Sequence, residues 1–489
     1  MPERIVPESF RVLLGVFAGC FQAASYRNFE LLVIGWVHCL GRRTITAVAL
    51  ASGAVDRRHI SVFHRFFSRA TWALDDLGWV LFRLAVAWVP AEAPLYMVLD
   101  DTLARKSGKG VALASMHHDP LLSTRRKPFF SFGHVWVVLA VWVPLPMGAS
   151  RGFAVPILCR LFVGAKRGGQ RDAPSRATTG ARLRAAEAAH PPVGSRPTKL
   201  ELARELIALA AIWANDRRVY VAVDSAYAGR ELLRARPANI HLISRLRLDA
   251  ALWTRPRRRR PGQTGRPRRR GTRVPAPQAL AATWRRWRSV PMTLYGRQVT
   301  PSIFALTALW YAALPDHPIR IVVVRDPTGR RQEEAFFCTD TTVTETFILE
   351  GYARRWTPEV TFHDTKQHLG LADSQAQAAA AVRRTAPVAG LVYALILLWY
   401  ADHVHPEVAA GHHPLAWPGR PWYRAKATPS FPDMLAALRR AGWRRCLSGP
   451  PSPTRRHQCP AFSWPDAVLA TAYRAEVEPS TAPCSVMQS

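Results

Sequence analysis

Four residues in the last third of the chain have types and spacings suited to chemistry on a phosphate group. Tyr352, Arg355, Glu359 and Lys366 follow one another at offsets of three, four and seven residues. On an α-helix, where each residue turns by about 100°, these offsets gather the four side chains into an arc of roughly 60°. One face would then carry a carboxylate, two cations and a phenol. The carboxylate suits a Mg²⁺ ligand, and the cations suit phosphate oxygens.

The helix in this stretch can be arranged in two ways. Pro358 lacks a backbone N–H and Thr357 before it is a favourable N-cap, so one alternative is a helix that begins at Pro358. Tyr352 and Arg355 would then reach the common face from a preceding turn. The other alternative is a kinked helix that continues through the proline.

The same four residues resemble a known signature. Tyr, two residues, Arg, three residues, Glu, six residues and Lys surround the catalytic glutamate of many bacterial insertion-sequence transposases, and all four residues match at every spacing. Those enzymes belong to the DDE class and have a ribonuclease-H-like core. The resemblance implies metal-dependent cleavage at the ends of a mobile element, followed by strand transfer into target DNA. It also implies two aspartates upstream, at the ends of β-strands.

Upstream segments follow the element order of that core. Apolar or alternating runs predict strands, and an amphipathic run predicts a helix. In chain order they are strands at residues 95–99, 133–143 and 153–162, a helix at 200–214, and strands at 219–223 and 240–246. Aspartates follow the first and the fourth strand. The sequence therefore predicts an α/β fold with a ribonuclease-H-like core.

Two neighbouring acids compete for the first aspartate position. Alternation along a strand places Asp100 and Asp101 on opposite faces. In the transposase family the first aspartate commonly precedes a threonine, and Thr102 follows Asp101, so the resemblance favours Asp101. Asp100 would then cap the next turn or support the metal ligands from behind.

The resemblance assigns roles to these residues. Asp101, Asp224 and Glu359 would be catalytic and would hold two Mg²⁺ ions, for which Mn²⁺ would substitute. Tyr352, Arg355 and Lys366 would hold the DNA backbone, together with Lys106 beyond the first strand. The partner would be double-stranded DNA, both terminal inverted repeats and target, bound by a homodimer in the bacterial cytoplasm at the nucleoid.

The net charge points independently to a polyanionic partner. The chain has 67 Lys and Arg against 34 Asp and Glu, a formal charge of +33. Such an excess favours nucleic acid. Residues 255–273 are an arginine-rich run without an acidic residue, in which Arg258, Arg259 and Arg269 are candidate DNA contacts. Arg439 and Arg440, near the C-terminus, are further candidates.

Cysteine usage and hydropathy argue against other classes of protein. Seven cysteines are scattered without a Cys-x-x-Cys spacing, which argues against a disulfide framework and a cysteine zinc site. The start of the sequence lacks the pattern of a signal peptide. The longest apolar runs, at residues 135–146 and 387–400, are too short to span a bilayer, so we expect core elements and no membrane partner.

The chain divides into five expected regions. Residues 1–92 read as a helical, DNA-binding domain, in which residues 44–67 form either a helix-turn-helix or a plain helical hairpin with a basic face. Residues 93–246 and 345–400 are the two parts of the catalytic core. Residues 247–344 are a β-rich basic insertion, whose Trp284, Trp287 and Trp310 either stack on bases or pack in a core. Residues 401–489 form a C-terminal region.

Rival hypotheses come from other classes. One is a catalytically inactive DNA-binding protein derived from a transposase, and another is a basic nucleic-acid scaffold that relies on residues 255–273. A zinc enzyme that uses His363 with His368, or His403 with His405, is a further alternative. The five-residue offset of the first pair is poor for ligands on one helical face.

Overall fold

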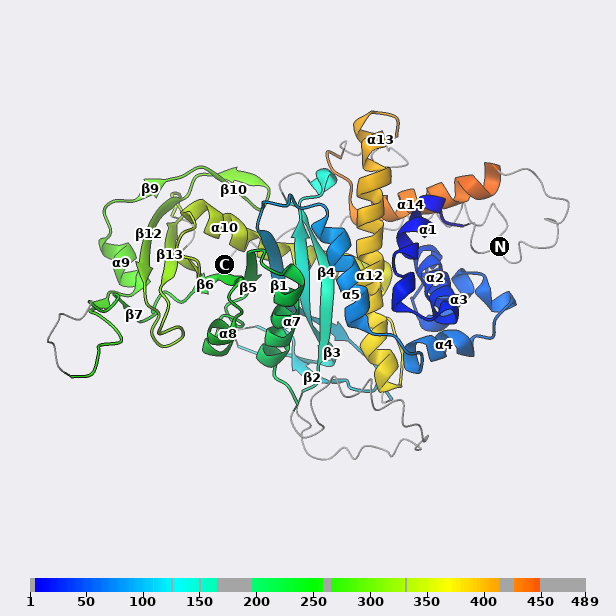
Figure 1. Ribbon diagram of the computed structural model, residues 1–489, viewed down its shortest axis with the longest axis horizontal. Coiled ribbons are helices and arrows are strands. Elements are labelled where there is room, and N and C mark those ends of the chain that lie inside the picture. Colours follow the sequence, from blue (N-terminus) through cyan, green and yellow to red (C-terminus); the bar gives the residue numbers. More distant parts are fainter. Residues whose placement is uncertain are drawn as a thin grey trace.

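A mixed sheet of ten strands runs through the middle of the molecule (Figure 1). The computed structural model describes residues 5–108, 110–124, 126–148, 151–164, 196–257, 265–329, 332–413 and 426–448. The strand order is β2-β3-β1-β5-β6-β14-β13-β12-β9, with β4 also paired to β3. The strands are β1 (Leu95–Arg105), β2 (Ser115–His118), β3 (Phe130–Val143), β4 (Phe153–Phe162), β5 (Val219–Val223), β6 (Ile240–Leu246), β9 (Arg288–Ser289), β12 (Ser302–Ala308), β13 (Ile319–Arg325) and β14 (Glu334–Cys338).

One half of this sheet has the predicted arrangement. β4, β3 and β1 pair antiparallel, whereas β1, β5 and β6 pair parallel. The predicted strands at residues 153–162, 219–223 and 240–246 are confirmed to the residue, and α7 (Lys199–Ala214) is the predicted helix. A Thr198–Glu201 capping box begins α7, because each side chain accepts a hydrogen bond from the other residue's backbone N–H. This order in a mixed α/β sheet is consistent with a ribonuclease-H-like fold.

The first strand is longer than predicted. We expected it to end before Asp100, but β1 continues to Arg105. The physical reason is its partner β3, which pairs with β1 from Tyr96 to Arg105, whereas β5 pairs only from Leu95 to Leu99. The two acids therefore lie within the strand, at the point where its parallel partner stops.

The strands expected in residues 247–344 continue the central sheet. β14 pairs antiparallel with β6, and β13, β12 and β9 follow outward. Smaller elements accompany them: the pairs β7 (Leu252–Trp253) with β8 (Arg273–Val274) and β10 (Met292–Leu294) with β11 (Arg297–Val299), and the helices α8 (Arg230–Ala235), between β5 and β6, and α9 (Pro277–Thr283). The rings of Trp284 and Trp287 pack on Phe304, and that of Trp310 packs on Phe337. Their contacts are those of core aromatics.

The first part of the chain is helical, as predicted. Its helices are α1 (Glu8–Gly15), α2 (Ala23–His38), α3 (Ile45–Ala51), α4 (Ser61–Ser68) and α5 (Leu74–Val86), with short 3₁₀ turns η2 (Ala18–Cys20) and η3 (Ala54–Asp56). Gly53 makes the turn after α3 with φ of +67°, a conformation that favours glycine. Figure 1 shows α1 to α4 on the side of α12 (Ala379–His403) away from the sheet, while α5 lies against the sheet itself.

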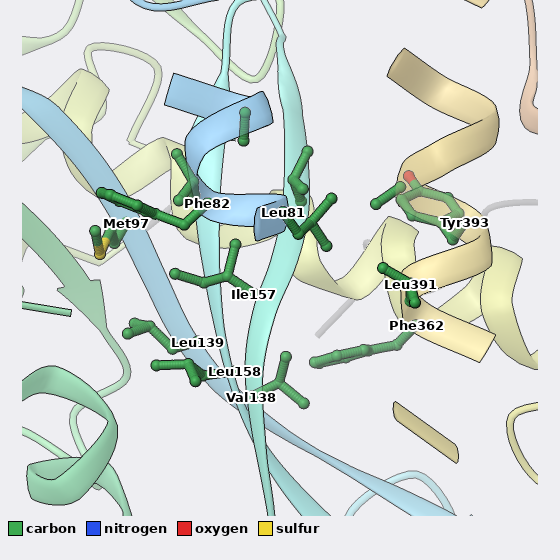
Figure 2. Packing of buried hydrophobic residues seen from close by; sticks show 14 of the residues in the cluster. Leu81, Phe82, Met97, Val138, Leu139, Ile157, Leu158, Phe362, Leu391 and Tyr393 are labelled. Atoms are coloured by element: carbon green, nitrogen blue, oxygen red, sulfur yellow. The ribbon is translucent and has the colours of Figure 1, made fainter. Parts of the chain in front are cut away.

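The helix α12 forms the centre of the core. It contacts β4 on one side and α1, α2 and α4 on the other, and it packs on α11 (Thr357–Leu369). Figure 2 shows Leu391 and Tyr393 of α12 near Phe362 of α11, with Leu81 of α5 and Ile157 of β4 close by. By length and composition α12 could cross a membrane, but 83% of its most apolar window is buried inside the molecule. Its apolar surface is thus accounted for by internal packing.

The C-terminal helix α14 (Phe431–Ser448) corrects one expectation. Arg439, a candidate DNA contact, is buried. Its Nε donates a hydrogen bond to the carbonyl of Val37, at 2.7 Å, and so joins α14 to α2. The short helix α13 (His405–Ala409) precedes this region. Because the Arg439 guanidinium satisfies buried backbone carbonyls, it is not offered to a partner at the surface.

At the end of α11, Gly370 lies next to Arg43 of the N-terminal part, so a substitution there measures how closely the two parts pack. Gly370 caps α11 with φ of +62°, and a Cβ there would collide with Asp373 and Arg43. Gly411 has φ of +74° but open space around it. We expect Gly411→Ala to cost about 1–2 kcal/mol from backbone strain alone, and Gly370→Ala roughly 1–2 kcal/mol more from the collision. Urea unfolding curves measure both costs, and equal losses would contradict this packing.

Candidate active site

Asp100 and Asp224 occupy neighbouring places where the pairing of β1 with β5 ends. The parallel register pairs Leu99 of β1 with Val223 of β5, so each aspartate is the next residue beyond the same register position. The rings of Tyr96 and Tyr220, an even number of residues before them, stack at 5.8 Å and both meet Phe347 of α10 (Glu345–Ala353). By alternation, Asp100 lies on the face of β1 that α10 covers.

The guanidinium of Arg355 joins the acids on this face. Its Nη1 lies 3.4 Å from Asp100 Oδ2, and its Nη2 lies 3.1 Å from Glu359 Oε1. Burial alone lowers the pKa of Arg355, but Tyr352, Asp100, Glu359 and Asp224 together raise it above its ordinary value. Two carboxylates that are distant in the sequence therefore contact one cation, and the charge of Asp224 acts on the same cation. The arginine side chain is only 17% exposed, so water screens these interactions weakly.

The local chain path explains how Arg355 and Glu359 reach this place. α10 ends at Ala353, a 3₁₀ turn η5 (Arg354–Trp356) follows, and α11 begins at Thr357 with Pro358 in its first turn. Arg355 thus lies in a turn before α11, as the first alternative expected, but Tyr352 lies in the helix α10. Thr357 has helical φ and ψ and is the first residue of α11, so the expectation that it is the N-cap is wrong. Arg354 fixes this turn, because its guanidinium lies 3.6 Å from the ring centre of Tyr96 and 4.0 Å from that of Trp142.

Asp101 lies on the other face of β1. Its Oδ2 accepts hydrogen bonds from Lys199 Nζ, at 2.6 Å, and from the Tyr227 hydroxyl, at 2.8 Å. Lys199 is the first residue of α7, which packs against β3 and β4. Asp101 thus has a cation and a phenol as its partners and makes none of the contacts that join Asp100 to Arg355.

Burial and like charge raise the pKa values of Asp100 and Glu359, the two acids that contact Arg355. Burial raises the pKa of Asp100 to about 7, although the backbone N–H of Asp101 and the charge of Arg355 oppose the rise. Burial also raises the pKa of Glu359, Arg355 opposes this, and Asp224 adds to it. Such shifts are typical of functional sites, where charges are held together against their mutual repulsion.

The predicted DNA-binding residues lie in different settings. Tyr352 is buried against Phe336, with ring centres 4.8 Å apart. Lys106 Nζ donates to the carbonyls of Ala372 and Ser374, at 2.7 and 2.6 Å. Lys366 lies further along α11, where burial lowers its pKa, Arg105 lowers it further and Asp119 raises it. Arg269 is exposed, and Arg258 and Arg259 lie outside the described residues. Their role in DNA binding stays a prediction.

The arrangement of the acids bears on metal binding. Carboxylates are the ligands that Mg²⁺ prefers. Within the described parts of the chain, however, no three His, Cys, Asp or Glu side chains are grouped so that they could hold a metal ion. The histidine pairs considered for a zinc site therefore belong to no such group either. In the structure it is the guanidinium of Arg355 that contacts both Asp100 and Glu359 and offsets their charge.

Sequence reasoning favoured Asp101 and missed the contacts of Asp100. Alternation predicted that the two acids face opposite ways, but β1 is buried on both faces, so its pattern does not reveal which face meets Glu359. The available signal was the even spacing of Asp100 from Tyr96, which places both side chains on one face of β1. It identifies that face only once the pairing of Tyr96 with Tyr220 is known.

The pH dependence of stability distinguishes the two acids. The pKa of Asp100 is raised from its ordinary value of 3.8 to about 7 in the folded protein, so the protonated side chain stabilises the fold. This contribution is complete when the pH is below 3.8, and it is lost as the pH rises towards about 7. We expect Asp100→Asn, measured with a chelator present, to stabilise the protein at pH 8 by on the order of 2–4 kcal/mol, and the gain to vanish near about pH 4.

The matched control is Asp101→Asn. It removes the charge-assisted bonds to Lys199 and Tyr227, so it should destabilise the protein at pH 8 by about 1–3 kcal/mol. Thermal and urea unfolding between pH 4 and pH 8 measure both variants. If Asp100→Asn destabilised the protein at every pH, the geometry around Arg355 would be wrong.

Comparison with known proteins supplies an independent finding. Residues 16–299 match the sequence model of a family described as DDE superfamily endonuclease. The matched segment covers more than half of the chain and contains Asp100, Asp101 and Asp224, but it ends before Glu359. No curated protein matches the chain.

Proposed function

The chain belongs to the DDE superfamily of endonucleases, and from this premise we propose that it is an insertion-sequence transposase. It would cleave DNA at the ends of its element and join the freed ends to target DNA by in-line phosphoryl transfer. The observation that carries the proposal is the contact of Arg355 with both Asp100 and Glu359, with Asp224 beside Asp100 in the register of β1 and β5. The Tyr-Arg-Glu-Lys spacing and the charge of +33 support the narrower assignment to a transposase.

The proposal names Asp100 in place of Asp101 as the first catalytic acid. Asp100 shares a guanidinium with Glu359, whereas Asp101 is paired with Lys199 on the other face of β1. Carboxylates act together on one phosphate only when they face the same space, and the contacts of Asp100 meet this condition. Asp101 would instead hold the start of α7 in place.

Mg²⁺, replaceable by Mn²⁺, stays the proposed cofactor because the acids are all carboxylates. Asp100, Asp224 and Glu359 would hold the ion, which would supply positive charge to the phosphoryl group that is transferred. Arg355 contacts two of these acids, and within the part of the chain that the structure describes its buried Nε has no hydrogen-bond partner. This guanidinium therefore keeps a donor that would suit a phosphate of the bound strand.

DNA is the proposed partner, as terminal inverted repeats and as target. Lys366 would contact the backbone next to the acids, and the arginines of residues 255–273 would contact it further away. A homodimer on DNA, in the bacterial cytoplasm, follows from the proposed reaction, since two ends must be brought together.

The experiment uses duplexes that carry the inverted repeats bracketing the gene. With Mg²⁺, we expect Asp224→Asn, Glu359→Gln and Asp100→Asn each to lower the cleavage rate by at least about 1000-fold, because the acids act as a unit. Binding, followed by fluorescence anisotropy, should stay within a few-fold of wild type. EDTA should abolish cleavage by the wild-type protein.

Asp101→Asn is the control that separates the two neighbouring aspartates. It should cleave within about tenfold of wild type, because its side chain lies on the other face of β1. A variant series in which Asp101→Asn is inactive and Asp100→Asn is active would restore the assignment made from sequence.

A second candidate is a DNA-binding protein of this family that has no catalytic activity. The specific observation in its favour is the lack of a metal-holding group among the described residues. It predicts sequence-preferring binding to the repeats without cleavage under any divalent metal. The cleavage assay above distinguishes the two candidates.

A further inference from the structure

A positively charged pocket lies where the N-terminal helices meet the core. Three segments form it: the loop between α2 and α3, the end of β1 with the loop that follows, and the turn between α11 and α12. Its volume is roughly 230 Å³, and its lining residues are Arg42, Arg105, Lys106, Ser107, Val111, Ser374 and Gln375. Three cations, two hydroxyls and an amide thus line one hollow.

The acids near the pocket do not cancel its charge. Asp119 is buried and bound by Arg105 at 2.7 Å and by Ser131 at 2.6 Å. Asp373 accepts a hydrogen bond from the backbone N–H of Arg43, at 2.8 Å. Against these two acids stand Arg42, Arg105 and Lys106, so one positive charge is left over. Lys366, whose pKa Arg105 lowers, adds a further cation nearby.

Arg42 is the cation best placed to take a ligand. It is exposed, and its guanidinium has no ion pair or hydrogen bond within the part of the chain that the structure describes. Arg105 and Lys106 are already held by Asp119 and by backbone carbonyls, so they shape the pocket and supply its field. A guanidinium with free donors beside hydroxyls and an amide suits the oxygens of a phosphate group.

Two elements connect this pocket to the acids. On β1, Arg105 follows Asp100 by five residues, which corresponds to about 17 Å of strand. On α11, Lys366 follows Glu359 by seven residues, or about 10 Å of helix. Because one DNA strand carries a phosphate for each 3.4 Å or so of helix axis, these two lengths correspond to about three to five nucleotides.

We propose that the pocket binds a backbone phosphodiester of the DNA duplex, about three to five nucleotides from the bond that is cut. The inference rests on the proposed function, since the acids define where the cut lies. It adds Arg42, a residue of the N-terminal helical part, to the residues that set the position of DNA on the core. Both parts of the chain would then hold one strand.

The test compares Arg42→Ala with Arg230→Ala, an exposed arginine at the start of α8, outside the pocket. Binding to the end duplex is measured by fluorescence anisotropy over a range of salt concentrations. Loss of one phosphate contact should weaken binding about tenfold for Arg42→Ala and reduce the slope of log affinity against log salt by about 0.9. Arg230→Ala should stay within about twofold of wild type.

Neutral methylphosphonates placed singly along the cut strand locate the contact. A substitution three to seven nucleotides from the cut should weaken the wild-type protein but not Arg42→Ala, because that variant has already lost the contact. If Arg42→Ala bound the duplex like wild type, or if both arginine variants lost affinity equally, the pocket assignment would be overturned.

Two controls separate this proposal from neighbouring ones. Inorganic phosphate that raises the Tm of wild type but not of Arg42→Ala, without competing with the duplex, would assign the pocket to free phosphate and overturn the DNA contact. If wild-type protein cleaves the duplex but Arg42→Ala binds it with the same salt dependence as wild type, the phosphate contact at Arg42 is overturned and the proposed function is not. Wild-type protein that does not bind the duplex would overturn the proposed function as well.

Discussion

The carboxylates on one face of the sheet are held together by a single guanidinium. Burying several like charges at one place is costly, and the raised pKa values of Asp100 and Glu359 record that cost. Arg355 offsets the cost by contacting Asp100 and Glu359 together, and Asp224 adds to the same field. Without a cation at this position, the acids would have to take up protons or move apart.

The rest of the core serves to place that arginine and that glutamate. The turn η5 is fixed by Arg354 between two aromatic rings, and α11 starts directly after it. The buried helix α12 packs on α11 and on β4, so α11, which carries Glu359, is supported by a large apolar surface. Trp36 of α2 donates to the carbonyl of Leu369, at 2.8 Å, and ties the end of α11 to the N-terminal helices. The N-terminal helices therefore contact the end of the helix that carries Glu359.

Charge is distributed unevenly over this framework. Several cations singled out in the sequence have structural partners: Lys106 bonds to backbone carbonyls, and Arg439 bonds to the end of α2. Buried cations of this kind satisfy carbonyls that would otherwise lack donors. Because such cations have internal partners, the net charge of +33 does not by itself say which lysine or arginine meets DNA.

The sequence alone determined the spans of β4, β5 and β6, the order of three acids along the chain, and the excess of positive charge. Those features follow from local periodicity and composition, which need no knowledge of neighbours. Only the tertiary structure decided that Asp100 faces Glu359 while Asp101 faces Lys199. A strand that is buried on both faces carries no marker of which face meets which helix, and the register with β5 supplies it. The pocket at Arg42 was likewise invisible, because its three segments come together only in the folded chain.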